Sequence, residues 1–252
     1  MRNLMADQLM ALIDAGTGRS DVDRAQLMLA WGYPDRDWSH LANLAVGARD
    51  HLLFKMRQEL FGNSAKLSCR CPKCDANYEF DIEIDEILSV DSKDASRHNE
   101  IEVAKGGQTI VFRPVSARDL AALPAGLDVQ KAMRFLAQCT ILSVQPESET
   151  SVSGAEHLDP ELVDIIAESL GEFDPLSVAA FGLTCSDCQQ EWRAFFDPVQ
   201  LLWRELEAEN AATLDEVHLL ATHYGWREAD IVAIPQARRK AYAGKLMSQS
   251  HD

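Results

Sequence analysis

The sequence lacks the features that mark secreted and membrane-spanning proteins. No stretch approaches the roughly 18 uninterrupted apolar residues that a membrane span requires. The first residues, from Met1 to Leu9, do not show the charged and then apolar pattern of a signal peptide. We therefore expect a protein that is made and kept in the cytoplasm, with no membrane among its partners.

Basic residues are also few. The chain has 24 Lys and Arg against 40 Asp and Glu, which gives a formal net charge of −16 and an isoelectric point near 4.8. Proteins that bind nucleic acid or anionic membranes gain much of their affinity from basic side chains. Even the last segment, residues 198–252, has eight acidic and six basic residues. We expect protein partners and no nucleic acid.

Common catalytic motifs are missing as well. The sequence contains neither His-Glu-x-x-His nor Gly-x-x-x-x-Gly-Lys-Ser/Thr. His218 and His223 are five residues apart, which places them about 140° apart around a helix. We expect no enzyme and no small-molecule substrate. An enzyme of unknown class stays an alternative, because the members of a catalytic triad can lie far apart in a sequence.

The chain does contain two Cys-x-x-Cys hooks, Cys71-Pro72-Lys73-Cys74 and Cys185-Ser186-Asp187-Cys188. Each runs into a strand-like segment, 78–84 after the first and 192–196 after the second. Two facing hooks supply the four thiolates of a tetrahedral Zn²⁺ site. Four protein ligands leave no open position, so we predict a structural zinc bound by Cys71, Cys74, Cys185 and Cys188. Free thiols fit a reducing compartment.

The other readings of the hooks are a redox couple, a disulfide or chance. A thioredoxin-like couple would open a helix within a βαβ pattern, whereas each hook here opens onto a strand. Because 110 residues separate the two hooks, the second must return to the first by folding. We assign no role to the remaining cysteines, Cys69 on the approaching strand and Cys139 in an apolar helix.

Hydrophobic residues make up 46% of the 252 positions, which is ordinary for a protein with a core and for one large or two small domains. We expect a mixed α+β fold, mainly helical, with a small β zinc-ribbon-like unit built from the hooks. The expected parts are an N-terminal helical head at 1–62, a split zinc-ribbon unit with an inserted hairpin and helices at 63–197, and a helical tail at 198–252.

Periodicity and capping residues predict the elements inside these parts. Ser20 resembles a helix cap, and Gly106-Gly107 resembles a hairpin turn. We expect helices at about 4–16, after Ser20, and at about 46–61, 116–123 and 128–142, a hairpin of 101–104 with 109–114, and polar loops at 89–100 and 145–154.

Three Asp-Pro pairs, Asp159-Pro160, Asp174-Pro175 and Asp197-Pro198, each predict a helix start, because Asp caps helices and Pro suits the first helical position. The first two helices should end near Gly171 and Gly182. The third should run to Gly225, although a capping-box pattern at Thr213-x-x-Glu216 could break it. A short helix at 226–234 and a segment after Pro235 follow.

The tail carries a set of motifs that points to a known family. They are Leu202-Trp203-Arg204-Glu205, Glu216-Val217-His218-Leu219-Leu220-Ala221, Tyr224-Gly225-Trp226, Glu228-x-x-Ile231, Ile234-Pro235 and Arg238-Arg239-x-x-Tyr242. With them, the chain resembles the T-even phage (bacteriophage T-four) baseplate hub assembly chaperone and baseplate protein family, as encoded in phage-like contractile injection system gene clusters. The hooks match those of the cluster-encoded relatives, and the order of elements matches over nearly the whole chain.

The resemblance implies a non-enzymatic baseplate component, or an assembly chaperone, of a contractile tail or injection system that contacts hub or wedge proteins. A zinc-ribbon regulator that binds nucleic acid remains an alternative. Because Trp, Tyr and Arg are enriched in interface hot spots, we predict that the tail docks onto its partner through six residues: Trp203, Tyr224, Trp226, Arg238, Arg239 and Tyr242.

Overall fold

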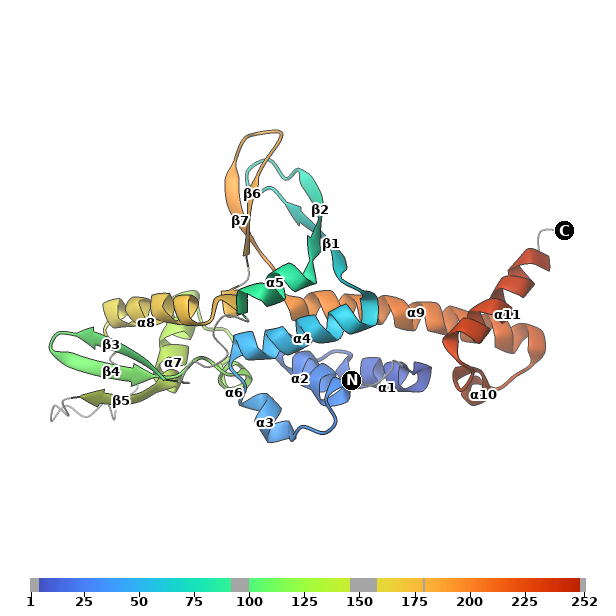
Figure 1. The fold of residues 1–252 in the computed structure, drawn as a ribbon, viewed down its shortest axis with the longest axis horizontal. Coiled ribbons are helices and arrows are strands. Elements are labelled where there is room, and N and C mark those ends of the chain that lie inside the picture. Colours follow the sequence, from blue (N-terminus) through green and yellow to red (C-terminus); the bar gives the residue numbers. More distant parts are fainter. Residues whose placement is uncertain (1–4, 92–99, 146–157, 179, 250–252) are drawn as a thin grey trace. The chain divides into compact units, whose positions relative to one another are not determined.

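The structure is a computed structural model that describes residues 5–91, 100–145, 158–178 and 180–249 (Figure 1). The predicted fold class is confirmed, because the described residues are mainly helical and carry three small antiparallel sheets. Within these ranges, no helix has both the length and the apolar character needed to cross a bilayer.

The chain folds into two compact units. Unit 1 combines Met1–Asp35 with Val199–Asp252, and unit 2 is the continuous segment Arg36–Pro198. The three-part division expected from the sequence stays a prediction. Its last boundary, between 197 and 198, lies one residue before the boundary between the two units.

Unit 1 is helical. Its helices are α1 (Ala6–Gly16), α2 (Asp21–Gly32), α9 (Pro198–Tyr224, which starts one residue before the unit), α10 (Glu228–Val232) and α11 (Gln236–Gln249). The cap expected at Ser20 is confirmed, because its hydroxyl oxygen accepts the Asp23 N–H at 3.2 Å. The break that Thr213 could have caused in α9 does not occur. Thr213 is buried, and its hydroxyl donates to the Glu209 carbonyl within the helix at 2.9 Å.

Unit 2 alternates helices with short strands. Its elements in chain order are α3 (Trp38–Ala42), α4 (Val46–Phe61), β1 (Ser64–Arg70), β2 (Asn77–Glu83), α5 (Ile84–Asp91), β3 (Ile101–Lys105), β4 (Gln108–Phe112), α6 (Ala117–Ala121), α7 (Val129–Thr140), β5 (Ile141–Gln145), α8 (Pro160–Phe173), the 3₁₀-helix η1 (Pro175–Val178), β6 (Ala180–Thr184) and β7 (Glu191–Phe195). The strands form a β1-β2 hairpin, a β3-β4-β5 sheet and a β6-β7 hairpin.

Several elements of unit 2 differ from the sequence-based expectation. The helix predicted to reach residue 142 ends at Thr140, because Ile141 begins a strand that pairs with β4 opposite Phe112. The helix predicted to run from Pro175 to near Gly182 is a single 3₁₀ turn, because β6 pairs with β7 from Ala180 onward. In both places, tertiary strand pairing overrides the local helical pattern.

The segment after β2 also differs. Ile84 was expected to end the strand and residues 89–100 to form a loop, but Ile84 begins α5, which continues to Asp91. Ile84 is fully buried, which gives this helix a tertiary anchor that its short sequence does not reveal. The predicted loop residues 92–99 and 146–154 lie outside the described residues.

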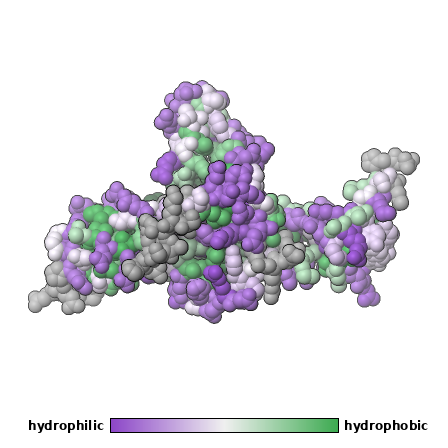
Figure 2. Space-filling view, in the orientation of Figure 1, coloured by the Kyte–Doolittle hydropathy of each residue, from purple (hydrophilic) through white to green (hydrophobic). Residues whose placement is uncertain are grey.

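A hydrophobic core lies between the three-stranded sheet and the helices α7 and α8. The central strand β4 contributes Ile110 and Phe112, which cluster with Ala137 of α7 and with Val163 and Ile166 of α8. Figure 2 shows hydrophobic residues that reach the surface in the region of this sheet and α8. The predicted hairpin of β3 and β4 is confirmed as two strands of this sheet.

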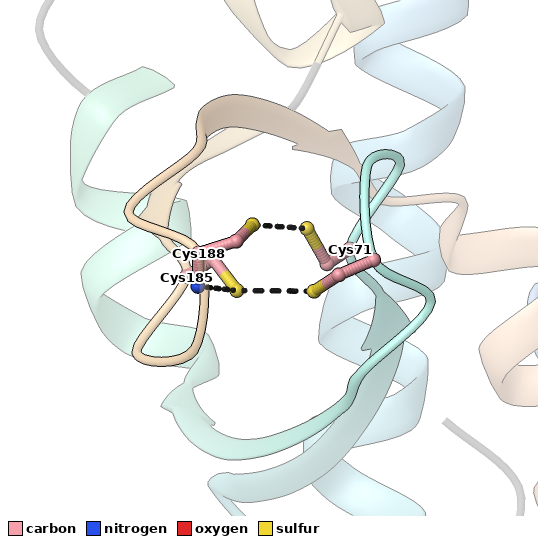
Figure 3. A group of neighbouring side chains, drawn as sticks. Cys71, Cys185 and Cys188 are labelled. Atoms are coloured by element: carbon pink, nitrogen blue, oxygen red, sulfur yellow. Dashed lines mark hydrogen bonds between the residues drawn. The ribbon is translucent and has the colours of Figure 1, made fainter.

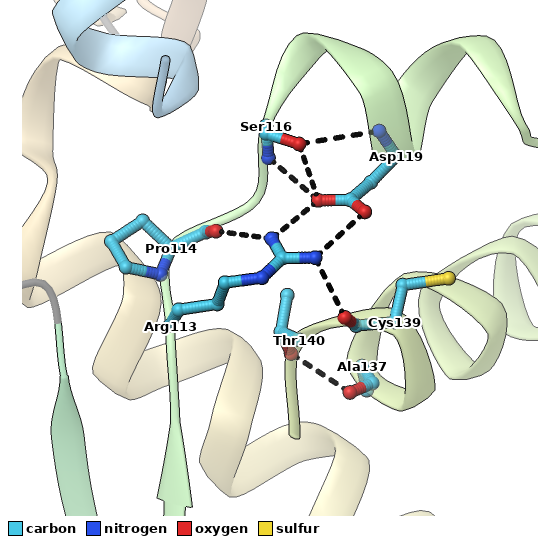
Figure 4. Close-up of polar contacts among 7 residues, drawn as sticks. All are labelled: Arg113, Pro114, Ser116, Asp119, Ala137, Cys139 and Thr140. Carbon is cyan, nitrogen blue, oxygen red and sulfur yellow. Dashed lines mark hydrogen bonds and ion pairs between the residues drawn. The ribbon is translucent and has the colours of Figure 1, made fainter. Parts of the chain in front are cut away.

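Arg113 joins three segments of unit 2 just after β4 (Figure 4). Its guanidinium donates to both carboxylate oxygens of Asp119, at 2.6 and 2.9 Å, and to the Cys139 carbonyl at 2.8 Å. Asp119 also accepts the N–H and the hydroxyl of Ser116. Burial alone would raise the pKa of Asp119, but the hydrogen bonds from Arg113 and Ser116 hold it below its usual value.

A second buried ion pair lies in the first turns of α4. Nε and Nη2 of Arg49 each lie 2.7 Å from Oδ1 of Asp50, and both residues are buried. Burial is the main cause that raises the pKa of Asp50 to about 6; the carboxylates of Asp197 and Asp174 contribute to the increase, and Arg49 opposes it. Within the folded protein, the protonated form of Asp50 is therefore favoured more than in the unfolded chain.

We expect Asp50 to make the stability depend on pH. Its folded pKa lies above the unfolded value of 3.8, so its contribution is fully present below pH 4 and is lost as the pH rises to about 6. The pKa difference corresponds to about 3 kcal/mol of unfolding free energy. Urea unfolding of the wild type and of Asp50→Asn from pH 4 to 7.5 should show the wild type losing about that much relative to the variant. A wild-type stability that stays constant or rises with pH relative to the variant would contradict this account.

Candidate metal centre and partner surface

The two Cys-x-x-Cys hooks form the turns of two hairpins that lie side by side (Figure 1). The first hook connects β1 to β2, and the second connects β6 to β7. In Figure 3 the cysteine sulfurs point toward one another across the space between the turns. The expectation that each hook leads into a strand is confirmed for both, since β2 follows the first and β7 the second.

The two turns share one backbone pattern. In the first, the Cys71 N–H donates to the Ala76 carbonyl and the Asp75 N–H donates back to the Cys71 carbonyl, both at 2.9 Å. In the second, the Cys185 N–H donates to the Gln190 carbonyl at 2.8 Å, and the Gln189 N–H donates to the Cys185 carbonyl at 3.0 Å. The fifth residue of each turn has a positive φ, 59° at Asp75 and 58° at Gln189. The left-handed residue reverses the chain, so that both sulfurs of a hook face the same side.

The four sulfurs fit a tetrahedral metal site. They all lie within 4.8 Å of one another. The sulfurs of Cys71 and Cys188 are 3.7 Å apart, and those of Cys74 and Cys185 are 3.5 Å apart. A tetrahedral ion with metal–sulfur bonds of about 2.3 Å would separate its ligand sulfurs by about 3.8 Å. The four thiols are therefore close to ligand geometry and could hold a metal ion.

The thiols differ in their tendency to ionise. The Tyr78 hydroxyl donates to the Cys185 sulfur at 3.1 Å and is the main cause that lowers the pKa of Cys185 to about 6. A backbone hydrogen bond from Ala76 alone would lower the pKa of Cys74, but the hydrogen bond with Cys185 and burial raise it to about 12. The hydrogen bond from Tyr78 thus favours the thiolate form of Cys185, and thiolates are the form that binds metal.

Tyr78 is a contact of the cluster that sequence reasoning did not identify. It lies in β2, donates to Cys185, and accepts the Ser186 N–H from the opposite hairpin at 2.7 Å. Its hydroxyl therefore links the two turns directly and orients the Cys185 sulfur. The aromatic residue four positions after a hook was the only available signal, and it does not by itself distinguish this role from packing.

An aromatic layer behind the sulfurs also joins the hairpins. Tyr78 packs edge-on against Trp192 with ring centroids 5.6 Å apart, and Phe80 packs likewise against Phe181 at 5.9 Å. Phe196 continues this layer to Phe54 of α4 in a stacked pair at 5.5 Å. Each such pair contributes roughly 0.5–1.5 kcal/mol beyond its buried area, so the hairpins hold together partly without a metal.

The other candidate ligands do not join the cluster. Cys69 and Cys139 are partly buried, and neither belongs to the group of four clustered cysteines. Cys139 contributes its carbonyl oxygen to the Arg113 network. His218 and His223 are both exposed on α9.

Two of the six residues predicted to bind a partner are buried within unit 1. Trp203 is 2% exposed, lies against Gly16, has Arg24 over its ring, and donates to Glu207 at 2.6 Å. A Cβ at residue 16 would come within 2.2 Å of the Trp203 ring, so glycine permits this packing. In this structure Trp203 presents no surface to a partner.

Arg239 is likewise 3% exposed. It pairs with Glu216 of α9 at 2.8 Å and donates to the Ile234 carbonyl at 2.9 Å, which ties α11 to α9. The sequence pattern Arg238-Arg239 could not separate the two residues, because only their positions around the helix decide which is buried. Arg238 is the exposed one.

The remaining aromatic residues gather around the turn after α9. Tyr224 stacks on Trp226 with ring centroids 4.7 Å apart, and Trp226 meets Tyr242 of α11 edge-on at 5.3 Å. Gly225 has a φ of 66°, which lets the chain reverse between Tyr224 and Trp226. Tyr224 is 40% exposed, whereas Trp226 and Tyr242 are partly buried against a hydrophobic cluster.

Arg238 lies one helical turn before Tyr242 on α11, so the two side chains share a face. Tyr224, Trp226, Arg238 and Tyr242 therefore form one amphipathic surface, which we call the tail surface. It combines an exposed aromatic ring with an exposed cation.

Comparison with known proteins places the chain in a family. The family model described as T4 bacteriophage base plate protein matches residues 34–203, whereas no curated protein and no solved structure matches the chain. The match starts two residues before unit 2 and ends five residues after it. Both hooks lie inside it, and the tail surface, which belongs to the motifs that carried the sequence resemblance, lies outside. Since the match covers more than half of the sequence, the chain belongs to the T4 bacteriophage base plate protein family.

Proposed function

We propose that this protein is a non-enzymatic part of a phage-type baseplate, as a subunit or as an assembly chaperone of a contractile tail or injection system. The observation that carries the proposal is the family match over the whole of unit 2. The protein acts through contacts with hub or wedge proteins, and assembly takes place in the bacterial cytoplasm. The acidic charge of −16 supports partners with basic surfaces.

We further propose that Cys71, Cys74, Cys185 and Cys188 hold one structural Zn²⁺. Four thiolates complete a tetrahedral zinc site and leave no position for substrate. The two short sulfur–sulfur distances each join one hook to the other, whereas a redox couple acts within a single Cys-x-x-Cys. A structural zinc contributes roughly 10–16 kcal/mol of apparent binding free energy. This exceeds what the aromatic pairs between the hairpins can supply.

Zinc content and metal removal test this assignment. We expect about one zinc per chain in natively purified protein, and we expect Cys74→Ser and Cys188→Ser each to lose the metal and cooperative melting. Cys69→Ser and Cys139→Ser are matched controls that should keep the metal, since neither sulfur belongs to the cluster. Metal-free native protein, or unchanged melting of the two cluster variants, would refute the zinc site.

Isolation of particles tests the baseplate role itself. We expect the protein to co-purify with baseplate assembly intermediates from cells that produce the particle. Its presence in mature particles would identify a permanent subunit, and its loss on maturation would identify a chaperone. Absence from both intermediates and mature particles, at a detection limit below one copy per baseplate, would contradict the proposed function.

The tail surface is the proposed contact outside the family region. We expect Tyr224→Ala and Arg238→Ala to reduce capture of a hub or wedge protein at least fivefold while circular dichroism stays unchanged, because interface hot spots favour Tyr and Arg. Leu214→Ala is the control, since Leu214 is 44% exposed on α9 and lies outside this surface.

Arg239→Ala should behave differently from Arg238→Ala. Without the Arg239 guanidinium, the partly buried Glu216 carboxylate loses this partner. Breaking such a pair costs roughly 3–5 kcal/mol of unfolding free energy. Equal capture by the wild type, Tyr224→Ala and Arg238→Ala would show that the tail surface does not bind the partner.

A further inference from the structure

Unit 2 contains a pocket of about 500 Å³ where its helices and the end of β7 converge. This volume lies within the range of pockets that bury ligands. Its walls are mainly apolar and are formed by Pro114, Val115, Leu120, Leu136, Leu170 and Phe196. The walls thus come from the segment after β4, from α6, α7 and α8, and from the segment after β7.

The rim of the pocket includes an aromatic ring open to solvent. Phe195, the last residue of β7, lines the pocket and is 74% exposed. Leaving a large apolar side chain in water forgoes roughly 1.5–3 kcal/mol of burial free energy. An exposed ring beside an apolar pocket is the arrangement expected of an anchor for an incoming chain.

The charged residues that line the pocket are mostly acidic. They are one cation, Arg49, and three carboxylates, those of Asp50, Asp174 and Asp197. Arg49 is committed to Asp50 by two contacts of 2.7 Å. Asp174 accepts the Gly47 N–H at 2.9 Å and so meets the positive end of α4. Among the side chains that line the pocket, acidic residues therefore outnumber basic ones.

The three carboxylates lie close enough to repel one another. Burial is the main cause that raises the pKa of Asp50, and the carboxylates of Asp197 and Asp174 raise it as well. An entering ammonium or guanidinium group would relieve this repulsion, whereas a carboxylate would increase it. Charge complementarity therefore favours a cationic occupant over an anionic one.

We propose that this pocket is a docking site for a segment of another baseplate protein in which a Lys or Arg is flanked by apolar or aromatic side chains. The apolar walls and Phe195 bury the flanking side chains, and the carboxylates that line the pocket hold the cation. A second copy of the chain is disfavoured, because each copy carries a net charge of −16. The proposal rests on the proposed baseplate function and names the chemistry of the partner.

A random-peptide selection on the purified full-length protein tests this proposal. The probe is a library of random 12-residue peptides displayed on yeast, and selected peptides are then synthesised and titrated. We expect a consensus with Lys or Arg between apolar or aromatic residues. Replacing that basic residue by Glu should weaken binding at least tenfold.

Two pairs of variants locate the binding site. Phe195→Ala should weaken the selected peptides at least tenfold, whereas Val129→Ala should not, because Val129 is 73% exposed and does not line the pocket. Asp197→Asn should reduce the preference for a basic over an acidic peptide, and Asp164→Asn, an exposed carboxylate on α8, should leave it unchanged. Phe195 and Asp197 are both exposed, so Phe195→Ala and Asp197→Asn should keep the fold.

The possible outcomes separate this proposal from the proposed function. No selected peptide, an acidic consensus, or binding insensitive to Phe195→Ala would overturn the docking site even if the protein co-purifies with baseplates. Basic peptides bound at Phe195 would support the site even if the protein is absent from baseplates. Self-association that competes with peptide binding would identify a second copy as the occupant and would also overturn the proposal.

Discussion

The contact between two hairpin turns whose hooks are 110 residues apart in the sequence is the constraint on which unit 2 depends. A two-stranded hairpin is marginally stable in water by itself, and closing a loop of this length costs about 4 kcal/mol of chain entropy. The aromatic pairs behind the sulfurs contribute a stabilising free energy of the same order. A metal ion bound by four thiolates would exceed both terms. A zinc ion at this cluster would therefore be the largest single contribution to holding the two hairpins together.

One of these two hairpins links the cysteine cluster to the proposed docking pocket. Strand β7 begins just after Cys188 and ends at Phe195 on the pocket rim. Phe196 then packs on Phe54 of α4, the helix whose first turns contribute Arg49 and Asp50 to the pocket. The family match covers all of these residues, whereas most of unit 1 lies outside it. The region matched by the family model therefore includes both the cysteine cluster and the pocket.

The sequence predicted the elements whose signals are local. Caps and glycines located α1, α2 and α4, the Asp-Pro pairs located the starts of α8 and α9, and the two hooks predicted a four-cysteine cluster. Strands β5 and β6 were missed, because their own residues also suit a helix and only their pairing with β4 and β7 makes them strands. The burial of Trp203 and Arg239, the contact of Tyr78 with Cys185, and the pocket all depend on tertiary packing. No local pattern encodes such contacts.

The central claim is that one zinc ion, held by four thiolates, closes unit 2 of a baseplate protein. The most direct measurement is the zinc K-edge X-ray absorption spectrum of the protein purified without added metal, with the fine structure fitted for ligand type and distance. The account predicts four sulfur atoms at about 2.3 Å. A shell that contains nitrogen or oxygen ligands, or fewer than four sulfurs, would contradict it.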